Sequence, residues 1–380
     1  MQSLLSRLPR GLRLNNKTVD KLAPSATKLH HNEACSAFGT DQQRRITSDR
    51  DLPTAYYYEK PLTASQFREI RIGRFPANIH EDGIRFKSSW EAYSTLLPPY
   101  GKKSLLPELR ISYDAGFSTT SVERAPTSIH ELCASHLSHK LHGRFPLHLQ
   151  SSLEFEVNYR IPIRKGDKLS ERKPDIAISH TAPDGKSNLV GVAEVGFSQP
   201  YADLKRWRDV WFEGVPTINV VILINLLEKP RFPRKEALEY IQKQGQQNFP
   251  EIDAIKEDDF ILQNPTDATS ARTAYGFIWC GTVQGTLEIW TRCPETGRPM
   301  LRSKPNCFYG PNVDGEPNIK IQPGDLVPSF ENETYEEVEL DAIALQKAIE
   351  KGRKRTAKER FVKLLKVARG VKEIQRRYSA

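Results

Sequence analysis

The sequence predicts an α/β fold built around one mixed β-sheet. Three observations carry this prediction: strict alternation of apolar and polar residues at 153–159, an apolar run at 217–227, and amphipathic helical spacing before and between the strands. The elements follow the order helix, three strands, helix, strand. Because a crossover helix precedes the last strand, we expect that strand to pair in parallel with a neighbour.

The first predicted helix begins at Ser128. Ser128-x-x-Glu131 has the form of a capping box, and the apolar residues that follow keep helical spacing until Gly143. The strand 153–159 has one apolar and one polar face, which predicts half-burial. A polar loop at 164–173 then leads to a strand at 175–179, the turn Pro183-Asp184-Gly185 and a third strand at 189–197.

The second predicted helix begins at Pro200 and ends at Gly214. Leu204, Trp207 and Trp211 form its apolar stripe, which favours packing in the core over stacking on bases. The strand at 217–227 has the composition of a strand buried on both faces. Further on, 275–283 and 286–292 flank Gln284-Gly285, a pattern that predicts a hairpin.

The organisation of the chain follows from these patterns. Residues 1–60 contain turn formers and clustered charges, so we expect a disordered basic segment. We expect 61–125 to be an irregular extension, 126–325 to be the α/β core with its hairpin, and 335–380 to form two basic helices. Leu and Arg spacing near the N-terminus resembles a mitochondrial transit peptide, whereas 351–355 resembles a nuclear localisation patch. We favour the nucleus, with the mitochondrion as the alternative.

The basic charge is concentrated at the C-terminal end. The formal net charge is +9, and residues 351–380 contain twelve Lys or Arg against Glu359 and Glu373. This distribution predicts contact with a polyanion through the last helix rather than over the whole surface, and together with the acidic pair described below it favours nucleic acid, DNA more than RNA. The alternative is a solvated amphipathic helix that docks its apolar stripe on the domain. The predicted contacts are Lys173, Arg353, Lys354, Arg355, Lys358, Lys363 and Lys366.

Other classes of protein lack support in the sequence. No run of eighteen apolar residues exists, so no membrane partner is expected. The five cysteines contain no C-x-x-C pair, which argues against a disulfide scaffold or a zinc site and against secretion. Phosphate-binding glycine motifs and a nucleophile elbow are also absent.

Two acidic residues lie where adjacent strands can bring them together. Asp175 follows Arg172-Lys173-Pro174 at the start of one strand, and Glu194 lies within the apolar strand 189–197. A buried carboxylate is costly unless it is paired or bound to a metal. Two such groups can bind Mg²⁺ or Mn²⁺, which would polarise a phosphoryl oxygen and activate water for phosphodiester attack. The alternative for Glu194 is a structural salt bridge to Lys205 or Arg206.

These residues resemble the PD-(D/E)XK nuclease superfamily. The match consists of Pro174-Asp175, Glu194-Val195-Gly196-Phe197-Ser198 with Gln199, and the helix that contains the tryptophans; it covers about 125–230 and is similar to a group of fungal proteins. The resemblance implies a restriction-endonuclease-like αβββαβ core, with Asp175 and Glu194 as metal ligands and catalytic residues.

One position departs from the pattern of that superfamily. Its lysine, two residues after the Glu, is Gly196 here. The resemblance implies that another residue would have to orient water, and the candidates are Gln199, Lys205 and Lys173. Two functions therefore stay open: a metal-dependent nuclease acting on DNA or RNA, and a catalytically decayed module that binds nucleic acid or protein.

Other candidate residues have simpler explanations. Glu131 fits a capping role, and Glu154 and Glu156 fit a solvated strand face, although either could supply a third metal ligand. His136, His139 and His142 spread over too much of a helix to hold zinc together, and His136 fits a core position.

Overall fold

A computed structural model describes residues 56–76, 78–79, 81–97, 109–157, 159–302, 304–311, 313, 320–327 and 337–370. The predictions of a transit peptide and, for 1–55, of disorder lie outside the described residues. So does the end of the predicted last helix at 371–380. Residues 56–60 were also predicted to be disordered, but they contain a short strand, β1 (Tyr57–Tyr58).

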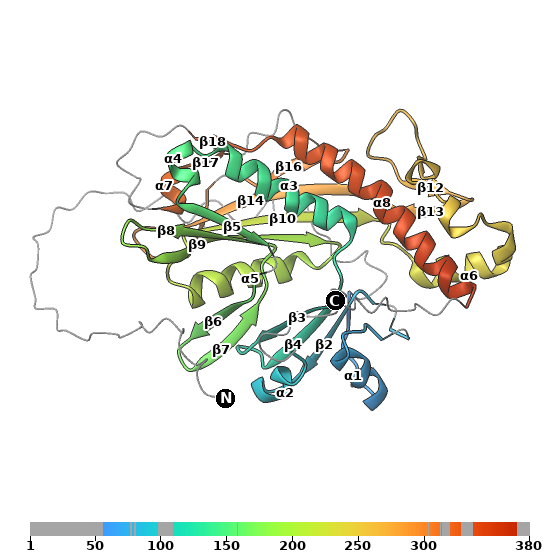
Figure 1. Ribbon diagram of the computed structural model, residues 1–380, viewed down its shortest axis with the longest axis horizontal. Coiled ribbons are helices and arrows are strands. Elements are labelled where there is room, and N and C mark those ends of the chain that lie inside the picture. The colour runs from blue at the N-terminus through green and yellow to red at the C-terminus, as the bar shows by residue number, and fades with distance from the viewer. Residues whose placement is uncertain are drawn as a thin grey trace, which may run out of the picture. The chain divides into compact units, whose positions relative to one another are not determined.

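The central sheet has seven strands (Figure 1). Its order is β15-β14-β10-β9-β8-β5, and β16 pairs with β14. The bounds are β5 Leu153–Val157, β8 Ile176–Thr181, β9 Ser187–Phe197, β10 Val220–Lys229, β14 Thr282–Arg292, β15 Pro299–Leu301 and β16 Asn306–Tyr309. β8 is antiparallel to β5 and β9, whereas β9 and β10 are parallel. The predicted mixed sheet and its parallel pair are therefore confirmed.

Helices cover both faces of this sheet. α3 (Ser128–Arg144) and α8 (Ala342–Ala368) pack together on one face, and α5 (Tyr201–Gly214) lies on the other (Figure 1). The larger apolar core fills the α3/α8 side. The smaller one lies under α5, where Trp207 and Trp211 are almost completely buried, which confirms their predicted core position.

The start of α3 differs from the prediction. Thr127 precedes the helix and makes no side-chain cap. The Ser128 hydroxyl instead donates to Glu359 on α8 at 2.5 Å, and Glu131 is exposed. The capping box predicted at Ser128 is therefore wrong, because a partner far along the chain takes the hydroxyl.

A second, six-stranded sheet forms where irregular chain was expected. Its order is β1-β2-β4-β3-β7-β6, with β2 Gly83–Lys87, β3 Leu109–Asp114, β4 Thr119–Arg124, β6 Ile161–Lys165 and β7 Lys168–Arg172. The helices α1 (Ala64–Arg71) and α2 (Trp90–Ser94) accompany it. Its apolar cluster includes Ile84, Tyr93 and Val122. The irregular extension at 61–125 and the polar loop at 164–173 were thus wrong predictions.

The hairpin predicted around Gln284-Gly285 is also absent from the described chain. β14 runs through both residues and pairs with β10 along its length. β13 (Phe277–Cys280) instead joins a small sheet with β12 (Arg272–Ala274) and β11 (Ile261–Leu262). Gly285 lies against Phe308, and an added Cβ would come within 3.0 Å of that ring.

The remaining elements are short or peripheral. They are α4 (Leu147–Gln150), α6 (Arg234–Gln244), α7 (Pro323–Leu326), β17 (Lys320–Ile321), β18 (Val338–Glu339) and three 3₁₀ turns at Gln246–Asn248, Ile252–Ala254 and Glu257–Asp259. Within the described part of 335–380, one helix replaces the two that we expected. Of the helices that the structure describes, none is both long and apolar enough to cross a membrane.

Replacing Gly352 with Ala should destabilise the protein by about 1–3 kcal/mol. An added Cβ on α8 would lie only 2.6 Å from the Ile129 Cα of α3, and backbone cannot move aside cheaply. The matched control is Gly143→Ala, on α3 with no atom near the added Cβ, which should stabilise by about 0.5–1 kcal/mol. Urea unfolding measures both variants, and equal effects would contradict close contact between the helices.

Candidate functional site

Asp175 lies at the start of β8 and is buried. Its Oδ1 accepts a hydrogen bond from Arg110 at 2.7 Å and lies 3.2 Å from His130 Nε2. Its Oδ2 accepts from the Val195 backbone N–H at 2.6 Å. Burial works to raise the pKa of Asp175, but the charges of Arg110 and His130 outweigh it and hold the pKa well below its usual range. Both carboxylate oxygens are thus in use within the protein.

Glu194 lies in β9 and has no exposed surface. Arg172 donates to both of its oxygens, from Nε at 2.7 Å and from Nη2 at 3.0 Å. The indole N–H of Trp211 donates to Oε1 at 2.8 Å, and the Arg172 guanidinium lies 4.1 Å from the Trp207 ring centre. A bidentate pair of this kind is geometrically specific, and the tryptophans close it from one side.

The cations come from the second sheet and the acids from the central one. Arg110 is on β3 and Arg172 on β7, whereas Asp175 immediately precedes β8 and Glu194 lies in β9. We call these four residues with His130 the charged cluster. Burial works to lower the pKa of Arg110, but the negative charges of Asp175 and Glu194 outweigh it and raise the pKa above its usual value. Both acids therefore act on one guanidinium. The structure therefore brings the two predicted acids into one cluster.

The charged cluster does not fit a divalent cation. Mg²⁺ needs open carboxylate oxygens and keeps several waters. Here each of the four oxygens already accepts a hydrogen bond from an N–H group, and Arg172 takes the position from which a cation would neutralise Glu194. Across the described residues, no group of three or more His, Cys, Asp or Glu side chains is arranged to hold a metal ion.

The space beside Gly196 is occupied. A Cβ added to Gly196 would meet Leu204 Cδ1 at 2.7 Å and the Gln199 amide nitrogen at 2.9 Å. Gln199 is thus the candidate that fills this space. Lys205 directs its ammonium to the ring of Tyr201, 4.5 Å from its centre, and Lys173 offers its backbone carbonyl to Arg110. Burial lowers the pKa of Lys173, and Arg160 and Arg110 lower it further.

Three of the basic residues predicted to bind nucleic acid serve the interior or pair with acids. Arg353 has no exposed side-chain surface, and its guanidinium donates to the carbonyls of Ala268 and Thr269. Lys354 pairs with Asp258 at 2.9 Å and Arg355 with Glu257 at 3.2 Å. Arg353 therefore belongs to the core, where it cannot contact a phosphate. Lys354 and Arg355 pair with the acidic 3₁₀ turn at Glu257–Asp259.

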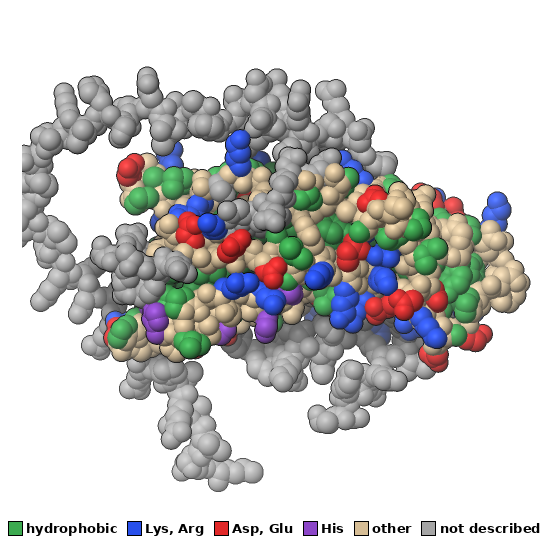
Figure 2. All heavy atoms as spheres, turned by 90° about the horizontal axis from the view of Figure 1, so that it is seen from above, with side chains coloured by type: hydrophobic (Ala, Val, Ile, Leu, Met, Phe, Trp, Pro, Cys, Tyr) green, Lys and Arg blue, Asp and Glu red, His purple; other side chains and the backbone are tan. Residues whose placement is uncertain are grey.

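The other predicted contacts on α8 lie on its outer side. Lys358 and Lys366 are partly exposed and Lys363 is exposed. Figure 2 shows Asp and Glu side chains interspersed with Lys and Arg over one face of the molecule, instead of one continuous basic area. A mixed surface of this kind attracts a polyanion less than the net charge suggests.

Sequence reasoning missed the two arginines, and one signal could have found Arg172. Ile161 and Ile163 have the spacing of one face of a strand, and Arg164 and Lys165 follow before Gly166-Asp167, which is a two-residue hairpin signature. Gly166 has φ +57°, as that turn requires. Recognising β6–β7 would have placed Arg172 at a strand end beside Pro174-Asp175. Arg110 carries no such signal, because its contact spans 65 residues.

Comparison with known proteins returned no matching family model, no matching curated protein and no matching solved structure.

Replacing Arg172 with Met should lower the free energy of unfolding by about 3–5 kcal/mol, because Glu194 would stay buried without its partner. Adding Glu194→Leu should recover most of that loss, since apolar residues of similar volume often replace a buried pair without cost. Urea unfolding measures both. Lys165→Met, which removes the exposed pair with Glu213, is the control and should have a small effect. A double variant no more stable than Arg172→Met would contradict this account.

Acid should destabilise the protein partly through Asp175. Because its pKa is lower in the folded state, Asp175 contributes stability that is fully present above about pH 4 and is lost as the pH falls through the folded pKa. Asp175→Asn should therefore be less stable at neutral pH, with a shallower loss of stability below about pH 4. Denaturant unfolding from pH 7 to pH 2 tests this, and parallel pH profiles for both proteins would contradict it.

Proposed function

We propose that this chain is a non-catalytic module with a PD-(D/E)XK-like core, and that it acts by binding a macromolecular partner. The resemblance of 125–230 supports the fold part of this proposal. The element order α3, β5, β8, β9, α5, β10 supports it as well, because its four strands belong to one sheet. Asp175 lies just before β8, and Glu194 lies in the adjacent strand β9.

The closed pair between Arg172 and Glu194 carries the non-catalytic part. Phosphodiester hydrolysis with a metal needs carboxylate oxygens that can bind the ion and leave room for water and substrate. Glu194 has no exposed surface, and a guanidinium already binds both of its oxygens. Exchanging Arg172 for an ion would leave a buried arginine without its counter-charge, which is unfavourable.

The space beside Gly196 supports the same proposal. A nuclease of this type needs a group that orients water, and Gln199 and Leu204 fill the position from which the superfamily's lysine acts. Lys205 and Lys173, the other candidates, direct their polar groups elsewhere or lie beside two arginines. Catalysis would therefore require rearrangement of several buried side chains at once.

The distribution of charge favours a protein partner over nucleic acid. Arg353 is buried in the interior, and the two terminal guanidinium nitrogens of Arg360 donate to Glu228 at 2.6 and 2.8 Å. Part of the positive charge of α8 is thus neutralised by partners within the fold. The nucleic-acid contact stays a prediction for Lys358, Lys363 and Lys366.

The protein should not cleave supercoiled plasmid, single-stranded DNA or single-stranded RNA in Mg²⁺ or Mn²⁺. We expect no difference in product between the wild type and Asp175→Asn or Glu194→Gln, and no calorimetric heat of Mn²⁺ binding. Thermal melting confirms that each variant is folded. Metal-dependent cleavage that disappears in a folded Asp175→Asn variant would contradict the proposal and favour the nuclease.

The same samples separate the two kinds of partner. Fluorescence anisotropy with a labelled single strand and a labelled duplex, between 50 and 200 mM salt, should show weak binding. A steep salt dependence that decreases in Lys358→Gln/Lys366→Gln would favour nucleic acid as the partner.

A further inference from the structure

β5 is an edge strand whose outer side is unpaired within the described chain. It lies at the end of the central sheet, next to β8 alone. The Thr181 N–H donates to the Ser152 carbonyl, and Leu153 lies opposite His180. Because the two sides alternate along an antiparallel strand, Glu154 and Glu156 direct their backbone groups to β8, whereas Leu153, Phe155 and Val157 direct theirs outward. An unpaired edge of this kind is a template for another strand.

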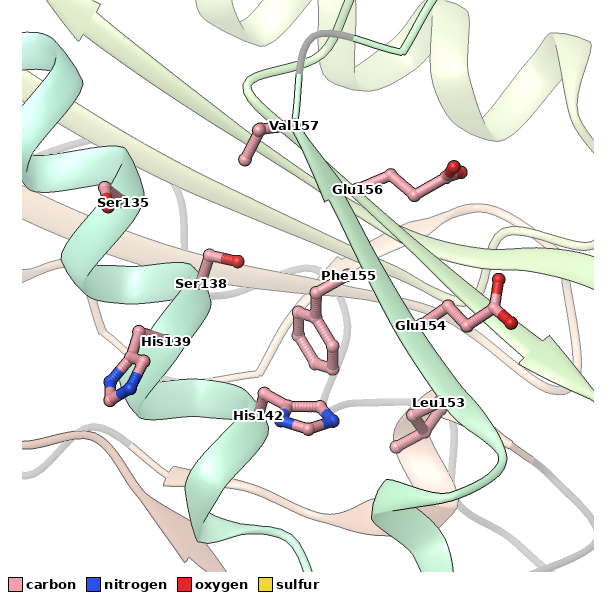
Figure 3. Close-up of a pocket in the computed structure, with 9 residues that line it drawn as sticks. All are labelled: Ser135, Ser138, His139, His142, Leu153, Glu154, Phe155, Glu156 and Val157. Atoms are coloured by element: carbon pink, nitrogen blue, oxygen red, sulfur yellow. The ribbon is translucent and has the colours of Figure 1, made fainter.

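A groove runs beside this edge, between α3 and β5 (Figure 3). Its volume is about 610 Å³, and it is open to the surface. Phe155 lies across it towards His142, and the two rings meet edge to face with centres 5.3 Å apart. Ser138 and His139 complete the wall on α3. A strand added to β5 would direct every second side chain into this groove.

The other face of β5 carries negative charge. In Figure 3, Glu154 and Glu156 point away from α3. Both are exposed, and no salt bridge among the described residues includes either of them. At the end of the strand, Val157 is 55% exposed, which is unusual for an apolar residue in a strand. The edge therefore offers backbone groups, an apolar end and two free carboxylates.

We propose that the β5 edge binds an extended segment of another protein in which Lys or Arg alternates with apolar residues. The apolar residues would enter the groove beside Phe155 and Val157. The basic residues would lie opposite Glu154 and Glu156, where charges of opposite sign on paired strands attract. This inference deepens the proposed function, on which it rests, because it names the site and the partner of the binding module.

Charge disfavours two other occupants. In a second copy of this chain paired through β5, the glutamates of both copies would lie on one face, and like charges on neighbouring strands repel. A nucleic acid would bring phosphates towards the same two carboxylates. A segment with a positive charge at every second position matches both faces of β5: its basic side chains lie beside the glutamates, and its apolar side chains enter the groove.

A labelled eight-residue peptide that alternates Lys and Val should bind the full chain in a fluorescence anisotropy titration. A matched peptide that alternates Glu and Val should bind at least tenfold more weakly. Glu154→Lys/Glu156→Lys should reverse this preference. Val157→Pro should weaken binding at least tenfold, because it removes an outward N–H without touching the bonds to β8, whereas the control Val157→Ala should weaken it about threefold or less.

Three results would overturn the inference: equal binding of the two peptides, an unchanged preference in Glu154→Lys/Glu156→Lys, or equal effects of Val157→Pro and Val157→Ala in variants that melt like the wild type. A dimer in sedimentation that Val157→Pro dissociates would make a second copy the occupant and would also overturn it. Metal-dependent cleavage would instead overturn the proposed function. Because the glutamates of β5 lie outside the charged cluster, the two failures are distinguishable.

Discussion

The ion pair between Arg172 and Glu194 joins the six-stranded second sheet to the seven-stranded central sheet. The arginine stands at the end of β7 in the second sheet, and the glutamate lies in the middle of the central one. Neither group could remain buried alone, since an unpaired charge in the interior costs several kcal/mol. The pair therefore fixes how the second sheet meets the central one. Arg110 repeats this arrangement with Asp175, and Arg85 on β2 does so with Asp203 on α5 at 2.9 Å.

Charge in this chain is largely a means of holding the interior together. Net charge counts every lysine and arginine alike, but the structure separates those that face solvent from those that do not. Arg353 and Arg360 on α8 bind carbonyls and a buried carboxylate, and they attach the helix to the small sheet and to β10. Through these two arginines the described part of the basic C-terminal end, up to residue 370, belongs to the core. Phe361, Leu364 and Leu365 are buried with them.

The sequence allowed the central sheet to be predicted because its local patterns agree with its final environment. Three of its patterns directly indicate which side chains are buried: the alternation in β5, the apolar run in β10 and the tryptophan stripe of α5. The second sheet could not be predicted in this way. Its β4 buries Thr119, Thr120 and Ser121, which look like surface residues in the sequence. The arginines that pair with Asp175 and Glu194 come from that second sheet. The sequence therefore allowed the two acids to be predicted, but not the arginines that neutralise them. At Gln284-Gly285 the local pattern predicted a turn, but the two residues lie inside a strand. The glycine is there because the Phe308 ring packs against it.

The position of Arg110 has a consequence for where this protein can be divided. The segment that resembles the nuclease superfamily begins near residue 125, and this boundary is the obvious point for a truncation. Such a fragment would keep Arg172 but would lose the guanidinium that neutralises Asp175, together with Glu123 and the Tyr57 hydroxyl that donates to it at 3.1 Å. It would leave Asp175 with only His130 and the Val195 N–H as partners, and it would expose the side of β7 that β3 covers. A fragment that keeps these contacts therefore has to begin no later than Tyr57, well upstream of residue 125.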